Sequence, residues 1–428
     1  MTELFEILTK LNPWWQDKKI GDTGIRREKY HKKIKKYHPK KELLIIKGVR
    51  RAGKTTLLKQ TIKDLLEQKT NPTKILFINF DEPDINTLDK PINRVLKTYT
   101  QEVNPGKAHL FLDEIQNINQ WEKTIKALYD QGEHNITLTG STSKLLESNL
   151  GGLLSGRYLT INITPLDFRE YLQFNHIKPP EKNIEYAAQK NKIMNKLKEY
   201  LTEGGFPRTV LEQDNELKKQ LLTNYYESIL YRDVLLAHEV RHTKALKELL
   251  HYLISNFTSP YTYEQISKTL GLDYNTVKDY ISYLTESGTL NEVNYFSYSL
   301  KTQSREPKKP YCIDNGLRNA VSFKFSEDYG RLAENLIYNE LKKQNKQVYY
   351  WRGRREVDFV VKEGDNRLEA INVTYTDDIK KIEVEGLKEF KEKHPNKTKK
   401  LTLITKDQEK KEEEITYTPL WKWLLETP

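Results

Sequence analysis

The stretch at residues 43–58, LLIIKGVRRAGKTTLL, decides the fold that the rest of the chain is expected to follow. An apolar run ends at Gly48, four residues follow, and Gly53, Lys54 and Thr55 then open a segment with the apolar spacing of a helix. Glycines let the backbone approach a polyphosphate, and the N–H groups of the loop and the helix N-terminus carry partial positive charge. The order of strand, G-x-x-x-x-G-K-T loop and helix predicts a phosphate-binding loop.

The predicted loop would bind a nucleotide through consecutive residues. Lys54 is expected to reach the β- and γ-phosphates, and the hydroxyl of Thr55 is expected to complete the coordination of Mg²⁺. The predicted ligands are therefore ATP and Mg²⁺. The residues expected to contact them are Gly48, Val49, Arg50, Arg51, Ala52, Gly53, Lys54, Thr55 and Thr56.

Length and composition narrow the class of protein. A chain of 428 residues exceeds what one hydrophobic core usually spans, so two to four domains are expected. No apolar run approaches the length of a membrane span and the first ten residues lack a signal-peptide pattern, which predicts a cytoplasmic protein without a membrane partner. A single cysteine, Cys312, excludes an internal disulfide and a cysteine-based zinc cluster. The net charge of +11 favours a polyanionic partner, which together with the motifs below indicates nucleic acid.

Two acids follow another apolar stretch, at 108–112, and complete the usual set of residues for phosphate chemistry. Asp113 is placed to hold Mg²⁺, directly or through water, and Glu114 to polarise the attacking water. With Lys54 and Thr55 already predicted as ligands, this pair makes hydrolysis, and not binding alone, the expectation.

Two further positions could complete a catalytic site. After the apolar stretch at 135–140, the hydroxyl of Ser141 is the first choice for sensing the γ-phosphate and that of Thr139 the second, while Ser143 could cap a helix at 144–150. Arg157 precedes a fifth strand at 158–163, on the flank of the sheet. It could reach the γ-phosphate of a neighbouring subunit, or it could be an ordinary surface arginine.

These motifs together carry a family resemblance. GVRRAGKTT, HLFLDEIQ, LTGSTS and SGRYLTINITPLDFREYL, followed by GGFP at 204–207, resemble the archaeal and bacterial AAA+ ATPases that carry an uncharacterised C-terminal nuclease-like domain. NPWW at 12–15 and YRDV at 231–234 are similar to that family too, so the resemblance spans essentially the whole chain. It implies that Lys54 and Thr55 are nucleotide ligands and that Asp113 and Glu114 are the metal and water residues. It further implies that Ser141 is the sensor and Arg157 the arginine finger. It also implies, less strongly, that Arg208 is a second sensor. The resemblance does not identify a substrate.

The predicted fold class is α/β, an AAA+ P-loop parallel sheet followed by three further parts. We expect a basic aromatic N-terminal arm at 1–40, the P-loop ATPase core at 41–172, a helical lid at 173–255, a winged helix-turn-helix at 256–312 and a restriction-endonuclease-like α/β domain at 313–428. The arm combines Asn12-Pro13-Trp14-Trp15 with a run of cations. It could bind nucleic acid, or it could be a solvated helical arm that docks through its tryptophans.

The segment at 263–285 has the pattern of a helix-turn-helix, with a glycine turn between two amphipathic stretches. The second helix would face a DNA groove with Tyr274, Asn275, Thr276, Lys278 and Ser282. A basic wing is expected at 291–309, where the cations are Lys301, Arg305, Lys308 and Lys309. Winged helices also contact proteins, so DNA and protein partners both stay open.

The C-terminal part resembles the core of restriction-endonuclease-like folds in Glu334, in Asp358 within EVDFVV, and in the strand at 368–374. Such nucleases need an acid or glutamine two residues before a lysine, so that both side chains share one face of the strand. Read from Glu369, the lysine position holds Ile371, and read from Asn372 it holds Thr374. Neither register supplies the lysine, so we expect a fold retained for binding or assembly.

The sequence therefore predicts a Mg²⁺-dependent AAA+ ATPase that acts as a switch or remodeller. It would work with DNA through the winged helix and the basic arm, and it would assemble as a homo-oligomer. One alternative is an ATP-gated DNA nuclease with Asp358 and Glu334 as metal ligands. Another is a nucleotide-dependent signalling scaffold that contacts proteins.

Overall fold

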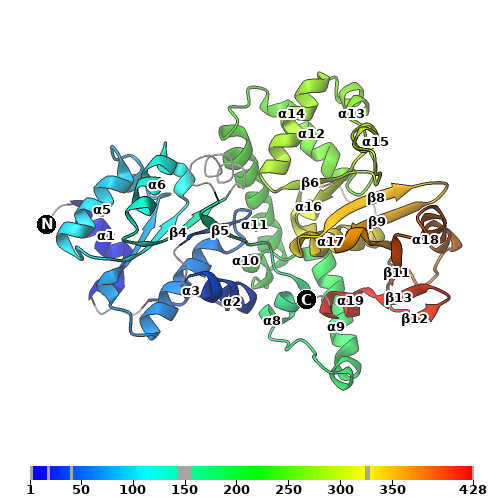
Figure 1. The fold of residues 1–428 in the computed structure, drawn as a ribbon, viewed down its shortest axis with the longest axis horizontal. Coiled ribbons are helices and arrows are strands. Elements are labelled where there is room, and N and C mark those ends of the chain that lie inside the picture. Colours follow the sequence, from blue (N-terminus) through cyan, green and yellow to red (C-terminus); the bar gives the residue numbers. More distant parts are fainter. Residues whose placement is uncertain (1–2, 17–19, 39–41, 142–155, 323–327, 427–428) are drawn as a thin grey trace. The chain divides into compact units, whose positions relative to one another are not determined.

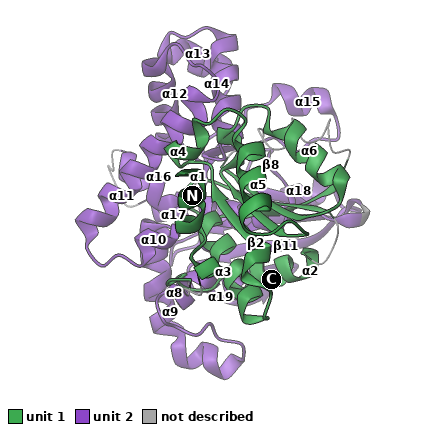
Figure 2. Cartoon of the chain, turned by 90° about the vertical axis from the view of Figure 1, so that its left-hand side faces the viewer, with its two compact units in different colours: residues 1–164 green, residues 165–428 purple. Residues whose placement is uncertain are grey.

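The computed structural model describes residues 3–16, 20–38, 42–141, 156–322 and 328–426. They form two compact units, residues 1–164 and 165–428 (Figure 2). The helix expected at 144–150 and its cap Ser143 lie outside the described residues. None of the helices in the described part of the chain combines the length and the apolar character needed to span a bilayer.

A five-stranded parallel sheet forms the centre of the first unit (Figure 1). Its strands are β1 (Leu43–Lys47), β2 (Ile75–Asn79), β3 (His109–Asp113), β4 (Asn135–Gly140) and β5 (Tyr158–Asn162), in the order β2-β3-β4-β1-β5. Strands β1 to β4 are mostly buried on both faces, as expected for a parallel sheet covered by helices. Because every pairing is parallel, the carboxyl ends of the strands lie along one edge of the sheet. The predicted α/β P-loop sheet is thereby confirmed.

Helices of the first unit pack around this sheet. They are α1 (Glu3–Leu11), α2 (Glu28–Tyr37), α3 (Lys54–Glu67), α4 (Pro83–Asn86), α5 (Pro91–Glu102) and α6 (Trp121–Gln131), with the 3₁₀ turns η1 (Pro13–Gln16), η2 (Pro72–Lys74) and η3 (Ile115–Asn117). Buried side chains of α1, α4, α5 and α6 form one hydrophobic core with the strands, for example Tyr99 of α5 and Trp121 of α6.

The N-terminal segment covers the sheet edge at β2. The Asn12 carboxamide donates to the Phe77 carbonyl oxygen at 3.0 Å and accepts from the Phe77 N–H at 2.7 Å, so it replaces a missing neighbouring strand. The indole N–H groups of Trp14 and Trp15 both donate to the Ile75 carbonyl oxygen. The tryptophans therefore dock on the sheet, as in the second of the two alternatives for the arm. On α2, the cations that remain exposed are Lys32, Lys33, Lys35 and Lys36.

The second unit begins with helices α8 (Phe168–Phe174), α9 (Asn183–Glu203), α10 (Pro207–Val210), α11 (Asn215–Ser228) and the π-helical segment η4 (Ile229–Leu236). The GGFP turn between α9 and α10 is built around Asp314. Gly204 has φ +76°, and a Cβ placed there would lie 2.1 Å from the Asp314 carboxylate, while the Gly205 N–H donates to that carboxylate at 2.7 Å. Gly204 is therefore required by its close approach to Asp314, and Gly205 is required because a Cβ there would lie 2.6 Å from the Leu166 carbonyl oxygen.

A group of four helices with a two-stranded sheet follows. It comprises α12 (Thr243–Ser255), α13 (Tyr263–Leu270), α14 (Tyr274–Glu286), β6 (Leu290–Val293), α15 (Leu300–Arg305) and β7 (Lys309–Cys312), with β6 and β7 antiparallel. Lys301 and Arg305 are exposed on α15 between these strands, whereas Lys308 pairs with Glu292. The prediction that Lys309 belongs to a basic wing was wrong, because its side chain is 1% exposed and pairs with three carboxylates.

The remainder of the second unit is a mixed six-stranded sheet with helices. The elements are α16 (Asn315–Val321), α17 (Tyr329–Lys343), β8 (Gln347–Arg352), β9 (Glu356–Lys362), η5 (Gly364–Asn366), β10 (Leu368–Thr374), α18 (Lys381–Lys393), β11 (Thr398–Thr405), β12 (Lys410–Glu412), β13 (Ile415–Pro419) and α19 (Leu420–Glu426). The strand order is β12-β13-β11-β10-β9-β8. Val360, Leu403 and Phe390 belong to a core that β9, β11 and α18 share.

Candidate nucleotide-binding site

The phosphate loop connects β1 to α3 at the carboxyl edge of the parallel sheet. Gly48 has φ +154°, and a Cβ there would lie 2.0 Å from the carbonyl oxygen of Ile163, which follows β5. Gly53 has φ +102° and precedes the first residue of α3. Both positions therefore need glycine, and the loop keeps a tight path that leaves the helix N-terminus directed at the site.

Lys54 lies folded over this loop. Its ammonium donates to the carbonyl oxygens of Gly48 at 3.0 Å and Val49 at 3.4 Å, and it lies 3.6 Å from Glu114 Oε1. The residue is only 4% exposed, so its charge acts in a region from which most water is excluded. An ammonium in this position can pair with the terminal phosphates of a nucleotide.

A continuous set of hydrogen bonds joins the ends of three elements at this edge. The Thr55 hydroxyl donates to Asp113 Oδ2 at 2.7 Å, and the Thr139 hydroxyl donates to Asp113 Oδ1 at 2.5 Å. The Thr139 oxygen also accepts from the Glu114 N–H at 2.9 Å. Burial raises the pKa of Asp113 above its ordinary value, although the hydrogen bonds from Thr139 and Thr55 oppose that shift. A hydroxyl and a carboxylate in contact are ligands that suit Mg²⁺.

Glu114 differs from Asp113 in its charge environment. Burial acts to raise the pKa of Glu114, but the cations Lys54 and Arg50 more than offset burial, and the pKa is lowered. The carboxylate is therefore ionised, as a residue that polarises water must be. Its backbone has φ +52°, an uncommon conformation for a residue other than glycine that often marks a functional site.

Gln116 is a site residue that the sequence analysis missed. Its amide nitrogen donates to Glu114 Oε2 at 2.5 Å and approaches Ser141 Oγ at 3.3 Å. Its amide oxygen is buried without a hydrogen-bond partner among the described residues. The only signal was its position in HLFLDEIQ, two residues after Glu114, because the turn η3 that brings it back is not visible in residue spacing.

The structure brings together Lys54, Thr55, Asp113, Glu114 and Ser141, but it does not bring Arg157 to this group. Strand β5 runs parallel to β1, with Leu43 opposite Tyr158, so Arg157 lies at the amino end of the sheet and the phosphate loop at the carboxyl end. Its side chain is 62% exposed and approaches Asp130 at 3.5 Å. Arg157 stays a predicted finger for a neighbouring subunit. Arg208, in the second unit, pairs with Glu212 and stays a prediction too.

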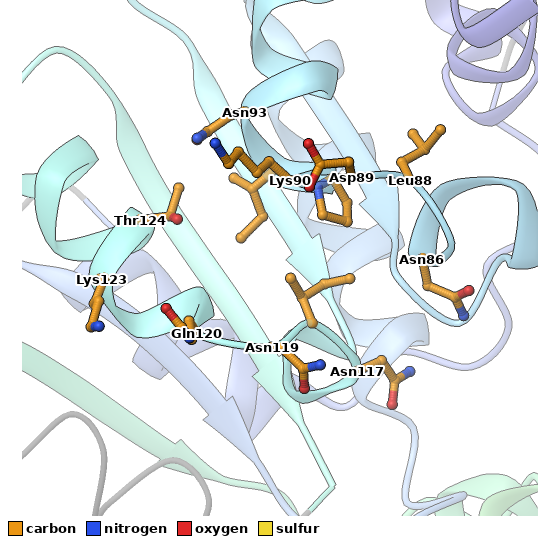
Figure 3. A pocket seen from close by; sticks show the side chains of 13 residues that line it. Asn86, Leu88, Asp89, Lys90, Asn93, Asn117, Asn119, Gln120, Lys123 and Thr124 are labelled. Atoms are coloured by element: carbon orange, nitrogen blue, oxygen red, sulfur yellow. The ribbon is translucent and has the colours of Figure 1, made fainter.

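A polar pocket of about 460 Å³ lies in the first unit, between the segment that leads into α5 and the segment that leads into α6 (Figure 3). Asn117 lines it, and the Asn117 N–H donates to the Glu114 carbonyl oxygen at 3.2 Å. One turn of η3 thus connects the pocket to Glu114. The polar side chains that line it are Asn86, Asp89, Lys90, Asn93, Asn117, Asn119, Gln120, Lys123 and Thr124.

Comparison with known protein families supports an AAA domain in the first unit. Residues 40–172 match the AAA domain family, so the first unit carries a nucleotide-binding domain of AAA ATPases. Residues 194–328 and 329–423 match two domains of unknown function, DUF8612 and DUF4143. The chain is 34% identical over 410 residues to the uncharacterized protein MJ1544 of Methanocaldococcus jannaschii, covering 90% of this chain and 88% of that protein. It therefore belongs to the same family of AAA proteins, as the resemblance predicted.

Other relatives extend the comparison. An uncharacterized protein of Haemophilus influenzae is 29% identical over 354 residues, covering 80% of this chain and 85% of that protein. AMPPCP-bound DnaA from Aquifex aeolicus matches with 17% identity and a TM-score of 0.25, over 64% of this chain and 91% of that chain. The Hsp104:casein complex of S. cerevisiae matches with 14% identity and a TM-score of 0.31, over 63% of this chain and 51% of that chain. Because both TM-scores are low, the fold assignment rests on the sheet order and the AAA match.

Proposed function

We propose that this protein is a Mg²⁺-dependent ATPase that uses hydrolysis as a switch or to remodel a partner. The observation that carries the proposal is the hydrogen-bonded set Thr55–Asp113–Thr139–Glu114 beside the Lys54 ammonium. Residues from α3, β3 and β4 meet there at the edge where ligands of open α/β sheets bind.

Each residue of the site has a role in this proposal. Lys54 would leave the carbonyl oxygens of Gly48 and Val49 for the phosphate oxygens, and Thr55 and Asp113 would hold Mg²⁺. Bound Mg²⁺ would neutralise charge on the β- and γ-phosphates. Glu114, ionised beside Lys54, would accept a hydrogen bond from the attacking water. The lone pair of the water oxygen would then be directed at the γ-phosphorus.

The test separates binding from hydrolysis. Lys54→Ala should abolish ATP binding, because the phosphates lose their buried counter-charge. Glu114→Gln should bind ATP normally and hydrolyse it about 10²- to 10⁴-fold more slowly, because the amide cannot polarise water. Fluorescent-nucleotide titration and phosphate release measure the two effects. Lys63→Ala, an exposed lysine on the same helix, is the matched control. Normal turnover in both site variants would refute the assignment.

We also propose that DNA is the partner. Exposed Asn275, Lys278 and Ser282 lie along α14, which follows α13 as the second helix of a helix-turn-helix, and exposed lysines lie along α2. The net charge of +11 supports a polyanionic partner. In this proposal, a winged helix binds the DNA duplex, and it consists of α12, α13, α14, β6 and β7.

Stimulation by DNA is the expected outcome. Duplex DNA should raise the ATPase rate, and its affinity should fall steeply with salt. Lys278→Gln should lower the slope of log affinity against log salt by about 1 if Lys278 contacts a phosphate. Lys247→Gln, in α12, is the control. If DNA at low salt changes neither the ATPase rate nor the electrophoretic mobility, the result would instead favour a scaffold that contacts proteins.

A further inference from the structure

A second cluster of charged side chains lies within the residue 165–428 unit. It contains Glu334 of α17, Glu356 and Asp358 of β9, and Glu383 of the first turn of α18. Lys309 of β7 lies among them. Glu334 and Asp358 are the residues that a nuclease of the restriction-endonuclease type would use to hold a divalent metal ion.

The Lys309 ammonium sits at the centre of this cluster. Its nitrogen lies 2.5 Å from Glu356 Oε1, 3.1 Å from Glu334 Oε1 and 3.6 Å from Asp358 Oδ1, and its side chain is 1% exposed. Burial alone would lower the pKa of Lys309, but Glu334, Asp358 and Glu356 raise it above its ordinary value. The ammonium is therefore enclosed by carboxylates from α17 and β9.

The structure also decides the register of β10. Glu369 accepts from the Thr402 hydroxyl at 2.8 Å and pairs with Lys400 at 2.8 Å, so its carboxylate is engaged by side chains of β11. Asn372 instead contacts the cluster, because its Oδ1 accepts from the Asp358 N–H at 2.9 Å. Asn372, and not Glu369, therefore occupies the position two residues before the lysine of a nuclease. The position of that water-activating lysine holds Thr374.

Several of the oxygens that a metal ion would need already accept hydrogen bonds. Asp358 Oδ2 accepts from the Val373 N–H at 2.9 Å, and Glu334 Oε1 accepts from both the Tyr311 hydroxyl and Lys309. Asn372 supplies its single amide oxygen to the backbone of Asp358. Among the described residues, no group of histidine, cysteine or acidic side chains has the arrangement of a metal site. A nuclease-type metal ion does not fit these residues.

We propose that the Lys309 ammonium takes the place of the divalent metal ion in this restriction-endonuclease-like cluster, so that the domain holds no metal there and cleaves no phosphodiester bond. A lysine on β7 thus supplies the cation of the cluster, although the strand that would carry the lysine of a nuclease lacks one. Burial and Glu334 raise the pKa of Asp358, and burial raises the pKa of Glu383. The inference does not depend on the ATPase proposal.

Metal binding is the first test, on the full chain without nucleotide. Asp113→Asn removes the metal residue of the phosphate-loop site, so that titration calorimetry with millimolar Mn²⁺ reports on the rest of the protein. We expect no Mn²⁺ binding that depends on the cluster. One equivalent of bound Mn²⁺ that disappears on adding Glu334→Gln would overturn the proposal.

Removing the lysine is the second test. In the Asp113→Asn protein, Lys309→Met should lower the melting temperature by about 10 °C, because it leaves buried carboxylates without their cation. Mn²⁺ should then restore part of the loss. Lys362→Met, an exposed lysine on the strand that carries Asp358, should change neither property. An unchanged melting temperature in Lys309→Met would contradict the proposal. If that variant does not fold, the calorimetry of the first test still decides.

Cleavage is the third test. Supercoiled DNA incubated with the wild-type protein and Mg²⁺ or Mn²⁺ should stay intact at high protein concentration. Nicking that Asp358→Asn abolishes would show a working nuclease and overturn the inference.

Discussion

Gln116 shows how a single side chain can set the state of the catalytic acid. It bonds to Glu114 on one side and to Ser141 on the other, and so it connects the residue that polarises water with the residue expected to sense the γ-phosphate. Burial acts to raise the pKa of Glu114, whereas the cations Lys54 and Arg50 and the hydrogen bond from Gln116 lower it. Gln116 is therefore a positioning residue for the proposed hydrolysis.

Gln116→Ala should slow ATP turnover by about 10- to 100-fold, since the Glu114 carboxylate loses its orientation. ATP affinity should change little, because the hydrogen bonds of Gln116 go to Glu114 and Ser141 and not to the phosphate loop. The pKa of Glu114 should rise when this hydrogen bond is lost, so the acid limb of the pH–rate profile should move to higher pH. Rate measurements from pH 5 to 8, with the exposed Gln131→Ala as control, check both effects. An unshifted profile with a normal rate would remove Gln116 from the site.

At the scale of elements, the edge of the parallel sheet at β2 is closed by a loop residue and not by another strand. Both hydrogen-bonding groups of Phe77 are satisfied by the side chain of Asn12, which is fully buried. The indoles of Trp14 and Trp15 share the carbonyl oxygen of Ile75 beside it. The segment at 12–15 therefore protects an edge that would otherwise offer unpaired backbone to another chain.

Asn12→Ala should destabilise the first unit by about 1–3 kcal/mol, because the N–H and carbonyl of Phe77 are left buried and unpaired. Urea unfolding followed by tryptophan fluorescence measures the loss, and the exposed Gln101→Ala on α5 is the control. Equal stability of Asn12→Ala and the wild type would mean that water or a neighbouring group replaces the carboxamide.

At the scale of the whole molecule, none of the described strands β1 to β5 contains an arginine that could serve the nucleotide site. Arg157 lies at the end of β5 opposite the phosphate loop, exposed at the edge strand of the sheet. A residue in that place can serve a phosphate site only in another copy of the chain. We therefore propose a homo-oligomer in which each subunit supplies Arg157 to its neighbour.

Mixing two inactive variants tests this arrangement. Arg157→Ala should bind ATP but turn it over slowly, and Lys54→Ala should not bind ATP. When the two are mixed, an intact Arg157 from a Lys54→Ala subunit can face an intact site in an Arg157→Ala subunit, so activity should return. The mass of the Glu114→Gln protein with ATP gives the assembly state. A fully active Arg157→Ala, or a mixture without recovery, would refute the shared site.

The sequence by itself determined the phosphate loop, the acids at 113 and 114, the parallel α/β sheet and the family. These features are local: a strand, a loop and the start of a helix are adjacent in the chain, and residue spacing reports them directly. Strand ends in a parallel sheet share one edge, so residues that end strands could be placed in one site before any contact was known.

Only the tertiary structure decided which distant side chains meet. Gln116 joins the site because a turn with left-handed backbone at Glu114 folds it back, and Asn12 reaches Phe77 across 65 positions of the chain. Lys309 looked like part of a basic surface, yet it is buried among carboxylates from α17 and β9. The physical reason is that packing fixes which face of β7 is buried, and a charge on that face must find its partners inside the protein.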